Sequence, residues 1–144
     1  MSALSAAFGR TAQPLPGQNG VSIWYMEQGF QTVVPTAELG SYRGRETDRF
    51  ALPAAPGGAG PDQATQISDA VELACCQPAV GAIFNFELTD EPSLSGWQSG
   101  LLWADGTRKP SYDTFKETIA AVGAGNVDCS RFPEGSRTVA LRKP

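Results

Sequence analysis

The feature that most constrains the fold is the spacing of hydrophobic residues. Along the chain it switches from a short apolar run, typical of a strand, to helical spacing and back to an apolar run. Residues 21–26 form a short run of β-branched and aromatic side chains, typical of a strand buried on both faces, with Trp24 in the core. Residues 80–88 form a second, mostly apolar run. Strands that alternate with helices predict βαβ units and a parallel sheet. Between the two runs, apolar side chains recur at helical spacing at Ile67, Ala70, Val71, Ala74 and Cys75.

Local signals give the ends of these elements. Asp62 is suited to cap the first helix, which we expect to stop at Pro78. Pro110 suits the first position of a last helix, and a hairpin is expected around residues 104–106. The remaining segments are expected to be the last turns of a helix (1–8), a long loop that is functional or disordered (31–61) and a polar tail or linker (123–144).

The amino-acid composition excludes several classes of partner and of catalytic mechanism. The net charge of −4, without clustered Lys and Arg, disfavours a nucleic-acid partner, and no apolar run is long enough for a membrane span. Histidine is absent, which excludes Ser-His-Asp and Cys-His catalysis within the chain. The three cysteines lack C-x-x-C spacing, so no zinc site is expected. Any acid–base chemistry must therefore rest on carboxylates.

Glu27 is the residue that carries the functional hypothesis. It stands at the carboxyl end of the first predicted strand, before Gly29 and the long loop. In a (β/α)8 barrel the active site is built at this edge from strand ends and their loops. The alternative interpretation is that Glu27 is a solvated residue at the end of a strand and has no chemical role. The same pattern also fits an open doubly wound sheet, but the glycine-rich nucleotide motifs of such sheets are absent.

Several segments resemble cellulase-like glycoside hydrolases of the (β/α)8 clan, which carry catalytic glutamates on strands four and seven. Residues 23–32, Ile-Trp-Tyr-Met-Glu-Gln-Gly-Phe-Gln-Thr, are similar to the seventh strand, where a Glu followed closely by Gly is the nucleophile. Residues 81–91 resemble the eighth strand and its loop, and residues 97–112 the entry into the last helix, where Lys109-Pro110 has a structural role. The similarity covers about residues 4–122.

The resemblance implies that residues 1–122 are the C-terminal portion of a TIM barrel, strands seven and eight with their helices, and that Glu27 is the nucleophile of a β-retaining glycosidase. Retention needs two carboxyl groups about 5–5.5 Å apart. The family's acid/base Glu follows an Asn on strand four, and this chain has no Asn-Glu dipeptide. We therefore expect the isolated chain to be inactive without the missing N-terminal part of the barrel. Neither a metal nor a cofactor is implied.

Further site residues follow from the same resemblance. Phe86 is the candidate aromatic platform for a sugar ring, where the family more often has Trp, and core packing is its alternative. Trp97 is a candidate for substrate contact or for anchoring its loop, whereas Trp103 is expected to pack in the hairpin. Asp90 and Glu91 are expected to cap helices or to hydrogen-bond sugar hydroxyls, with solvated loop charge as the alternative. With Glu87, they are the in-chain alternatives for the second carboxylate.

The cysteines suggest export. Cys75 and Cys76 end the first helix and Cys129 follows the last one, so a Cys76–Cys129 bridge would suit a secreted enzyme. The alternative is three free thiols. The sugar itself stays open among cellulose-type β-glucan, mannan and a small β-glycoside. Two other functional classes also remain, a carbohydrate-binding barrel relative without turnover and a purely structural α/β fragment.

Overall fold

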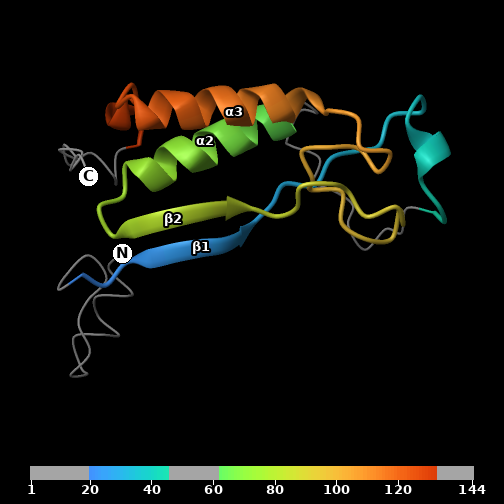
Figure 1. Ribbon diagram of the computed structural model, residues 1–144, viewed down its shortest axis with the longest axis horizontal. Helices are drawn as coiled ribbons and strands as arrows, with labels where there is room; N and C mark the ends of the chain where they lie inside the picture. The colour runs from blue at the N-terminus through green and yellow to red at the C-terminus, as the bar shows by residue number, and fades with distance from the viewer. Residues whose placement is uncertain (1–19, 46–61, 133–144) are drawn as a thin grey trace.

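The computed structural model describes residues 20–45 and 62–132 as a β-α-β arrangement followed by a further helix (Figure 1). The elements are β1 (Ile23–Gln28), the 3₁₀ turn η1 (Leu39–Ser41), α2 (Gln63–Cys75), β2 (Val80–Asn85), α3 (Pro110–Gly123) and the 3₁₀ turn η3 (Cys129–Arg131). The expected helix end at residues 1–8, the second half of the long loop (46–61) and the end of the tail (133–144) lie outside the described residues.

The two strands pair in parallel, which confirms the predicted sheet type. Ile23 pairs with Val80 and Tyr25 with Ile83, and the register shifts before Gln28 pairs with Asn85. Both strands end at the same edge, and the loops that follow them gather there (Figure 1). The protein is thus a small α/β fold, and the described residues form two strands rather than a closed barrel.

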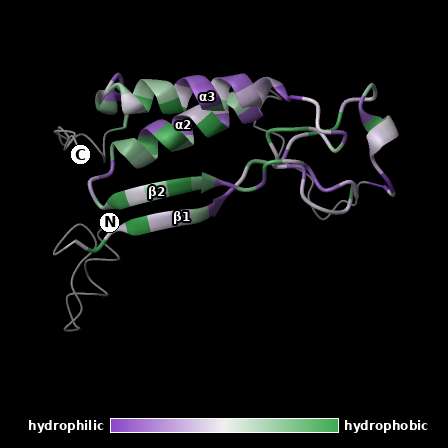
Figure 2. Cartoon of the chain, viewed as in Figure 1, coloured by the Kyte–Doolittle hydropathy of each residue, from purple (hydrophilic) through white to green (hydrophobic). Residues whose placement is uncertain are grey.

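Both helices lie on one side of this sheet. α2 packs against β2, and α3 packs against α2 (Figure 1). The buried side chains of α2 include Ile67, Val71 and Ala74, three of the positions that the helical spacing predicted. In Figure 2 β2 is largely green (hydrophobic), whereas β1 is green at its start, paler along its length and purple (hydrophilic) at its carboxyl end.

The other face of the sheet is open among the described residues, which makes the prediction of a doubly buried strand wrong for this part of the chain. Trp24, expected in the core, is 58% exposed, as is Met26, and Phe84 is 45% exposed. Successive side chains of a strand point to opposite faces, and the described helices cover only the face of Tyr25 and Ile83. The Trp24 and Phe84 rings lie 6.1 Å apart, so the open face carries a small aromatic cluster.

The predicted signals at the start of each helix are confirmed. Asp62 Oδ1 accepts a hydrogen bond from the Thr65 backbone N–H at 2.8 Å, and Pro110 occupies the first turn of α3. α2 ends at Cys75, three residues before Pro78. The hairpin is closed by an antiparallel bridge between Leu102 and Arg108.

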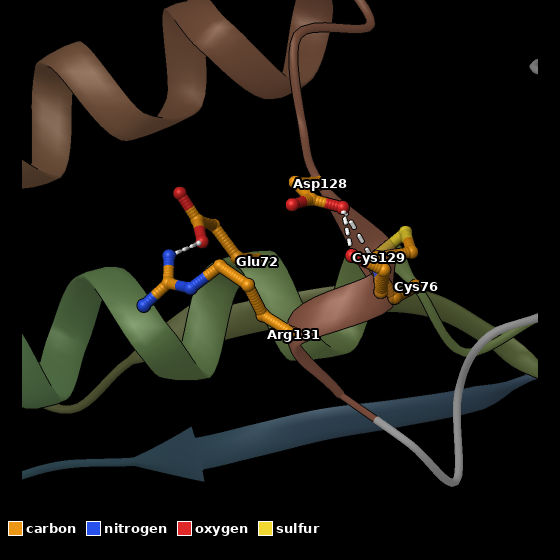
Figure 3. The surroundings of a disulfide bond; sticks show 6 residues. Glu72, Cys76, Asp128, Cys129 and Arg131 are labelled. Carbon is orange, nitrogen blue, oxygen red and sulfur yellow. Dashed lines mark hydrogen bonds and ion pairs between the residues drawn. A yellow bond between two sulfur atoms is a disulfide. The ribbon is translucent and has the colours of Figure 1, made fainter.

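A disulfide joins Cys76 to Cys129, as predicted, with their Cα atoms 5.4 Å apart. Cys75 is free. Figure 3 shows the segment beyond α3 held against α2 by this bond and by Arg131, whose guanidinium donates to Glu72 at 2.8 Å. Arg131 also donates to Asp69 at 3.0 Å. The first part of the predicted polar tail is therefore anchored to the helix layer.

Removing the cap of α2 gives a first testable prediction. Asp62→Ala is expected to lower the free energy of unfolding by about 1 kcal/mol, because a backbone N–H of the first turn loses its acceptor. Hydrogen bonds from Thr65 hold the pKa of the Asp62 carboxyl below its ordinary value. Its charged form therefore stabilises the fold above the unfolded pKa, and this contribution is lost as the pH falls through the folded pKa.

Urea denaturation of the two proteins at neutral and at acid pH measures this difference. Asp62→Asn is the matched control, because the amide oxygen still caps the helix but cannot be protonated in this range. Equal stabilities of wild type and Asp62→Ala at neutral pH would contradict the capping role.

Candidate functional site

The predicted nucleophile, Glu27, is exposed and is the penultimate residue of β1. It lies at the edge where both strands end, and its side chain is not enclosed by an apolar layer. The chain leaves the strand at Gly29, where the two loops approach closely. An added Cβ at Gly29 would overlap the Phe86 carbonyl oxygen and lie 2.9 Å from the Ser99 Cβ. Glycine after the strand end thus has a packing reason, which is independent of any chemistry at Glu27.

An aromatic corner, defined by Phe86 and Trp97, lies at the same edge. Phe86 directly follows β2 and is half-buried, and its peptide bond to Glu87 is cis. The Phe86 and Trp97 rings meet edge to face with their centroids 6.0 Å apart. Trp97 remains 43% exposed, and Leu88, two residues after Phe86, is 63% exposed. The corner therefore presents an apolar surface to solvent at the carboxyl end of β2.

Asp90 is buried, so it fits neither of two roles that the sequence left open for it, a contact with sugar hydroxyls and a solvated loop charge. Its side chain has no solvent exposure, and its oxygens accept hydrogen bonds from the Tyr42 hydroxyl (2.7 Å), Lys109 Nζ (2.6 Å) and the Gly100 N–H (2.9 Å). A carboxylate with these partners and no exposed surface does not reach a ligand. Asp90 therefore holds the loops together, and we do not retain it as a substrate-binding residue.

Lys109 is buried as deeply as its partner. Its side chain is 1% exposed, and its ammonium also donates to the Gln98 carbonyl at 3.0 Å and lies 4.7 Å from the centre of the Trp103 ring. Burial lowers the pKa of Lys109, and the hydrogen bond to Asp90 opposes that effect. The expected structural role at the start of α3 thus includes a buried ion pair, which the Lys-Pro pattern did not reveal. Trp103 packs in the hairpin as expected and is 8% exposed.

The two remaining acidic residues of this loop are half-buried. Glu91 Oε2 accepts a hydrogen bond from the Trp97 N–H at 3.2 Å, so it helps to fix the backbone that carries the Trp97 ring. Burial raises the pKa of Glu87, and the nearby Glu91 and Asp90 raise it further, while Lys109 acts in the opposite direction. Glu87 Oε2 is buried and has no hydrogen-bond partner among the described residues.

Gln63 is a buried polar residue that the sequence analysis missed. Its amide donates to the carbonyls of Phe30 (2.8 Å) and Gly100 (3.2 Å), and its oxygen accepts from the Ser111 hydroxyl at 2.7 Å. It therefore ties α2 to both loops and to α3. The signal was available, because Gln63 precedes Ile67 by four residues and so shares its apolar helix face.

The described residues hold no group of three or more His, Cys, Asp or Glu side chains suited to a metal ion. Within the same ranges, every helix is too short or too polar to cross a membrane. Comparison with family models, with curated proteins and with solved structures finds no match to the chain.

Proposed function

We propose that the chain is the C-terminal part of a retaining β-glycoside hydrolase barrel in which Glu27 is the nucleophile. The observation that carries this proposal is an exposed carboxylate at the carboxyl end of a parallel strand, at the same edge as an exposed aromatic corner. Active sites of (β/α)8 barrels are built at that edge. Glycoside hydrolysis needs carboxyl groups and no cofactor, which suits a chain without histidine.

In the proposed reaction, the Glu27 carboxylate attacks the anomeric carbon and forms a covalent glycosyl-enzyme, while a second carboxylic acid protonates the leaving oxygen. Water then releases the sugar with the second group acting as base. That second group is the acid/base Glu expected on the missing N-terminal part of the barrel. Within the chain Glu87 is the alternative, because a carboxyl group with a raised pKa is suited to donate a proton.

The aromatic corner supports a carbohydrate ligand. Sugar rings have apolar faces that pack on aromatic side chains, and Trp97 exposes 43% of its surface next to Phe86. Together with the resemblance of residues 23–32 to the seventh strand of β-retaining glycosidases, this corner favours a β-linked sugar or polysaccharide as the substrate class. The Cys76–Cys129 disulfide supports an exported enzyme, since such bonds persist in oxidising compartments.

The open sheet face supports the barrel. Trp24, Met26 and Phe84 are exposed on the side away from the helices. In a barrel this side faces the interior, which side chains from all strands fill in layers. Strands one to six, the expected N-terminal part, would bury these residues.

A substitution of the nucleophile tests the proposal. In the complete barrel that carries this segment, Glu27→Ala is expected to reduce hydrolysis of aryl β-glycosides by several orders of magnitude, because no covalent intermediate can form. Sugar binding, measured by titration calorimetry, is expected to persist. Glu117→Ala on the exposed surface of α3 is the matched control and should keep full activity.

Full hydrolysis by Glu27→Ala would refute Glu27 as nucleophile. Turnover by the isolated 144-residue chain at ordinary enzyme rates would show that no carboxyl group is missing. A wild-type barrel that binds sugar without hydrolysing it would favour the non-catalytic carbohydrate-binding relative. A protein that neither binds nor hydrolyses sugar would favour the structural α/β fragment.

A further inference from the structure

A buried hub of four residues, Tyr42, Asp90, Gln98 and Lys109, joins the loops at the carboxyl ends of the strands. The Asp90 carboxylate accepts hydrogen bonds from Tyr42, in the loop after β1, and from Lys109, immediately before α3. The Lys109 ammonium also donates to the Gln98 carbonyl. All four residues are at most 9% exposed, so these bonds are shielded from competition with water.

Gln98 connects the hub by hydrogen bonds to the loop that follows Glu27. Its backbone N–H donates to Gln31 Oε1 at 2.6 Å, and its carbonyl oxygen also accepts from the Thr32 N–H at 3.2 Å. Gln98 is the residue next to Trp97. The placement of Trp97 relative to the end of β1 is therefore set through Gln98, which Lys109 holds.

A second connection runs through Tyr42. Its hydroxyl donates to Asp90 Oδ2 at 2.7 Å and accepts from the Ala104 N–H at 3.1 Å, so it links the loop after β1 to the hairpin. The neighbouring backbone pairs with the loop after β2, because the Arg43 N–H donates to the Pro92 carbonyl and the Leu94 N–H to the Arg43 carbonyl.

We propose that Tyr42, Asp90 and Lys109 are positioning residues that fix the loop after Glu27 against the aromatic corner and so set where the sugar lies relative to the nucleophile. This inference rests on the proposed glycosidase function. None of the three is exposed enough to contact a substrate, so they act through Gln98 and the two loops.

Tyr42→Phe tests the coupling with little disturbance, because it removes one hydroxyl and keeps a buried ring. We expect the amides of Thr32, Arg43 and Leu94 to exchange hydrogen about tenfold faster or more, as the loss of a hydrogen bond to a charged group implies. Tyr25→Phe is the matched control, since its hydroxyl donates to Gln77 instead, away from these loops. Exchange at the three loop amides should not change in that variant.

The effect on catalysis is measured as KM and kcat in the complete barrel. Tyr42→Phe is expected to raise KM for aryl β-glycosides several-fold while kcat changes less, in assays run well below the melting temperature of the variant. Equal exchange rates in the two variants would overturn the coupling, and faster exchange with an unchanged KM would overturn the positioning role. A wild-type barrel without any hydrolysis would instead overturn the proposed function, while the exchange rates would still report on the hub.

Discussion

Lys109→Met is expected to lower the free energy of unfolding by about 3–5 kcal/mol, the cost of breaking a buried ion pair by removal of one partner. The Asp90 carboxylate has no solvent exposure and would keep only neutral donors, from Tyr42 and Gly100. Methionine has nearly the length of lysine and still packs on the Trp103 ring. The loss therefore reports on the charge rather than on a cavity.

Arg108→Met, one residue earlier, is the matched control. Arg108 and Asp113 lie 3.8 Å apart, and their side chains are 63% and 64% exposed. Surface pairs of this kind contribute about 0–1 kcal/mol. Urea denaturation followed by circular dichroism compares the three proteins. A loss for Lys109→Met as small as that of Arg108→Met would contradict the buried ion pair.

Removal of the disulfide is expected to have a similar effect. Replacement of Cys76 and Cys129 by alanine should lower stability by about 4 kcal/mol, because the bond closes a loop with a sequence separation of 53 residues and limits the unfolded chain. The segment after α3 would then be held to α2 through the ion pairs of Arg131, which are partly exposed (Figure 3).

Denaturation with and without a dithiol reductant measures this contribution. Cys75→Ala, which keeps the disulfide, should change stability much less and should respond to reductant as the wild type does. Mass analysis after alkylation gives an independent check, with two additional reactive thiols expected after reduction. An unchanged thiol count, or a reductant-insensitive wild type, would contradict the bond.

The elements that the sequence predicted well are those that depend on neighbours a few residues apart. The helical spacing from Ile67 to Ala74, the cap at Asp62 and the proline at the start of α3 all appear in the structure. The position of Glu27 at the end of β1 follows in the same way, because a strand run and a following glycine locate the strand end. These features require no knowledge of what packs against them.

Burial and pairing across the chain depended on tertiary structure. Asp90 was expected to cap a helix, to contact a sugar hydroxyl or to lie in solvent, but Lys109, 19 residues later, and Tyr42, 48 residues earlier, enclose it. Trp24 was expected in the core, but no described layer covers its face of the sheet. The residue type determines which hydrogen bonds and ion pairs a side chain is able to form. The packing of layers and loops decides which partner comes within reach of it. The sequence by itself thus determined the strand–helix order and the place of Glu27, and the tertiary structure decided which polar groups are buried and paired.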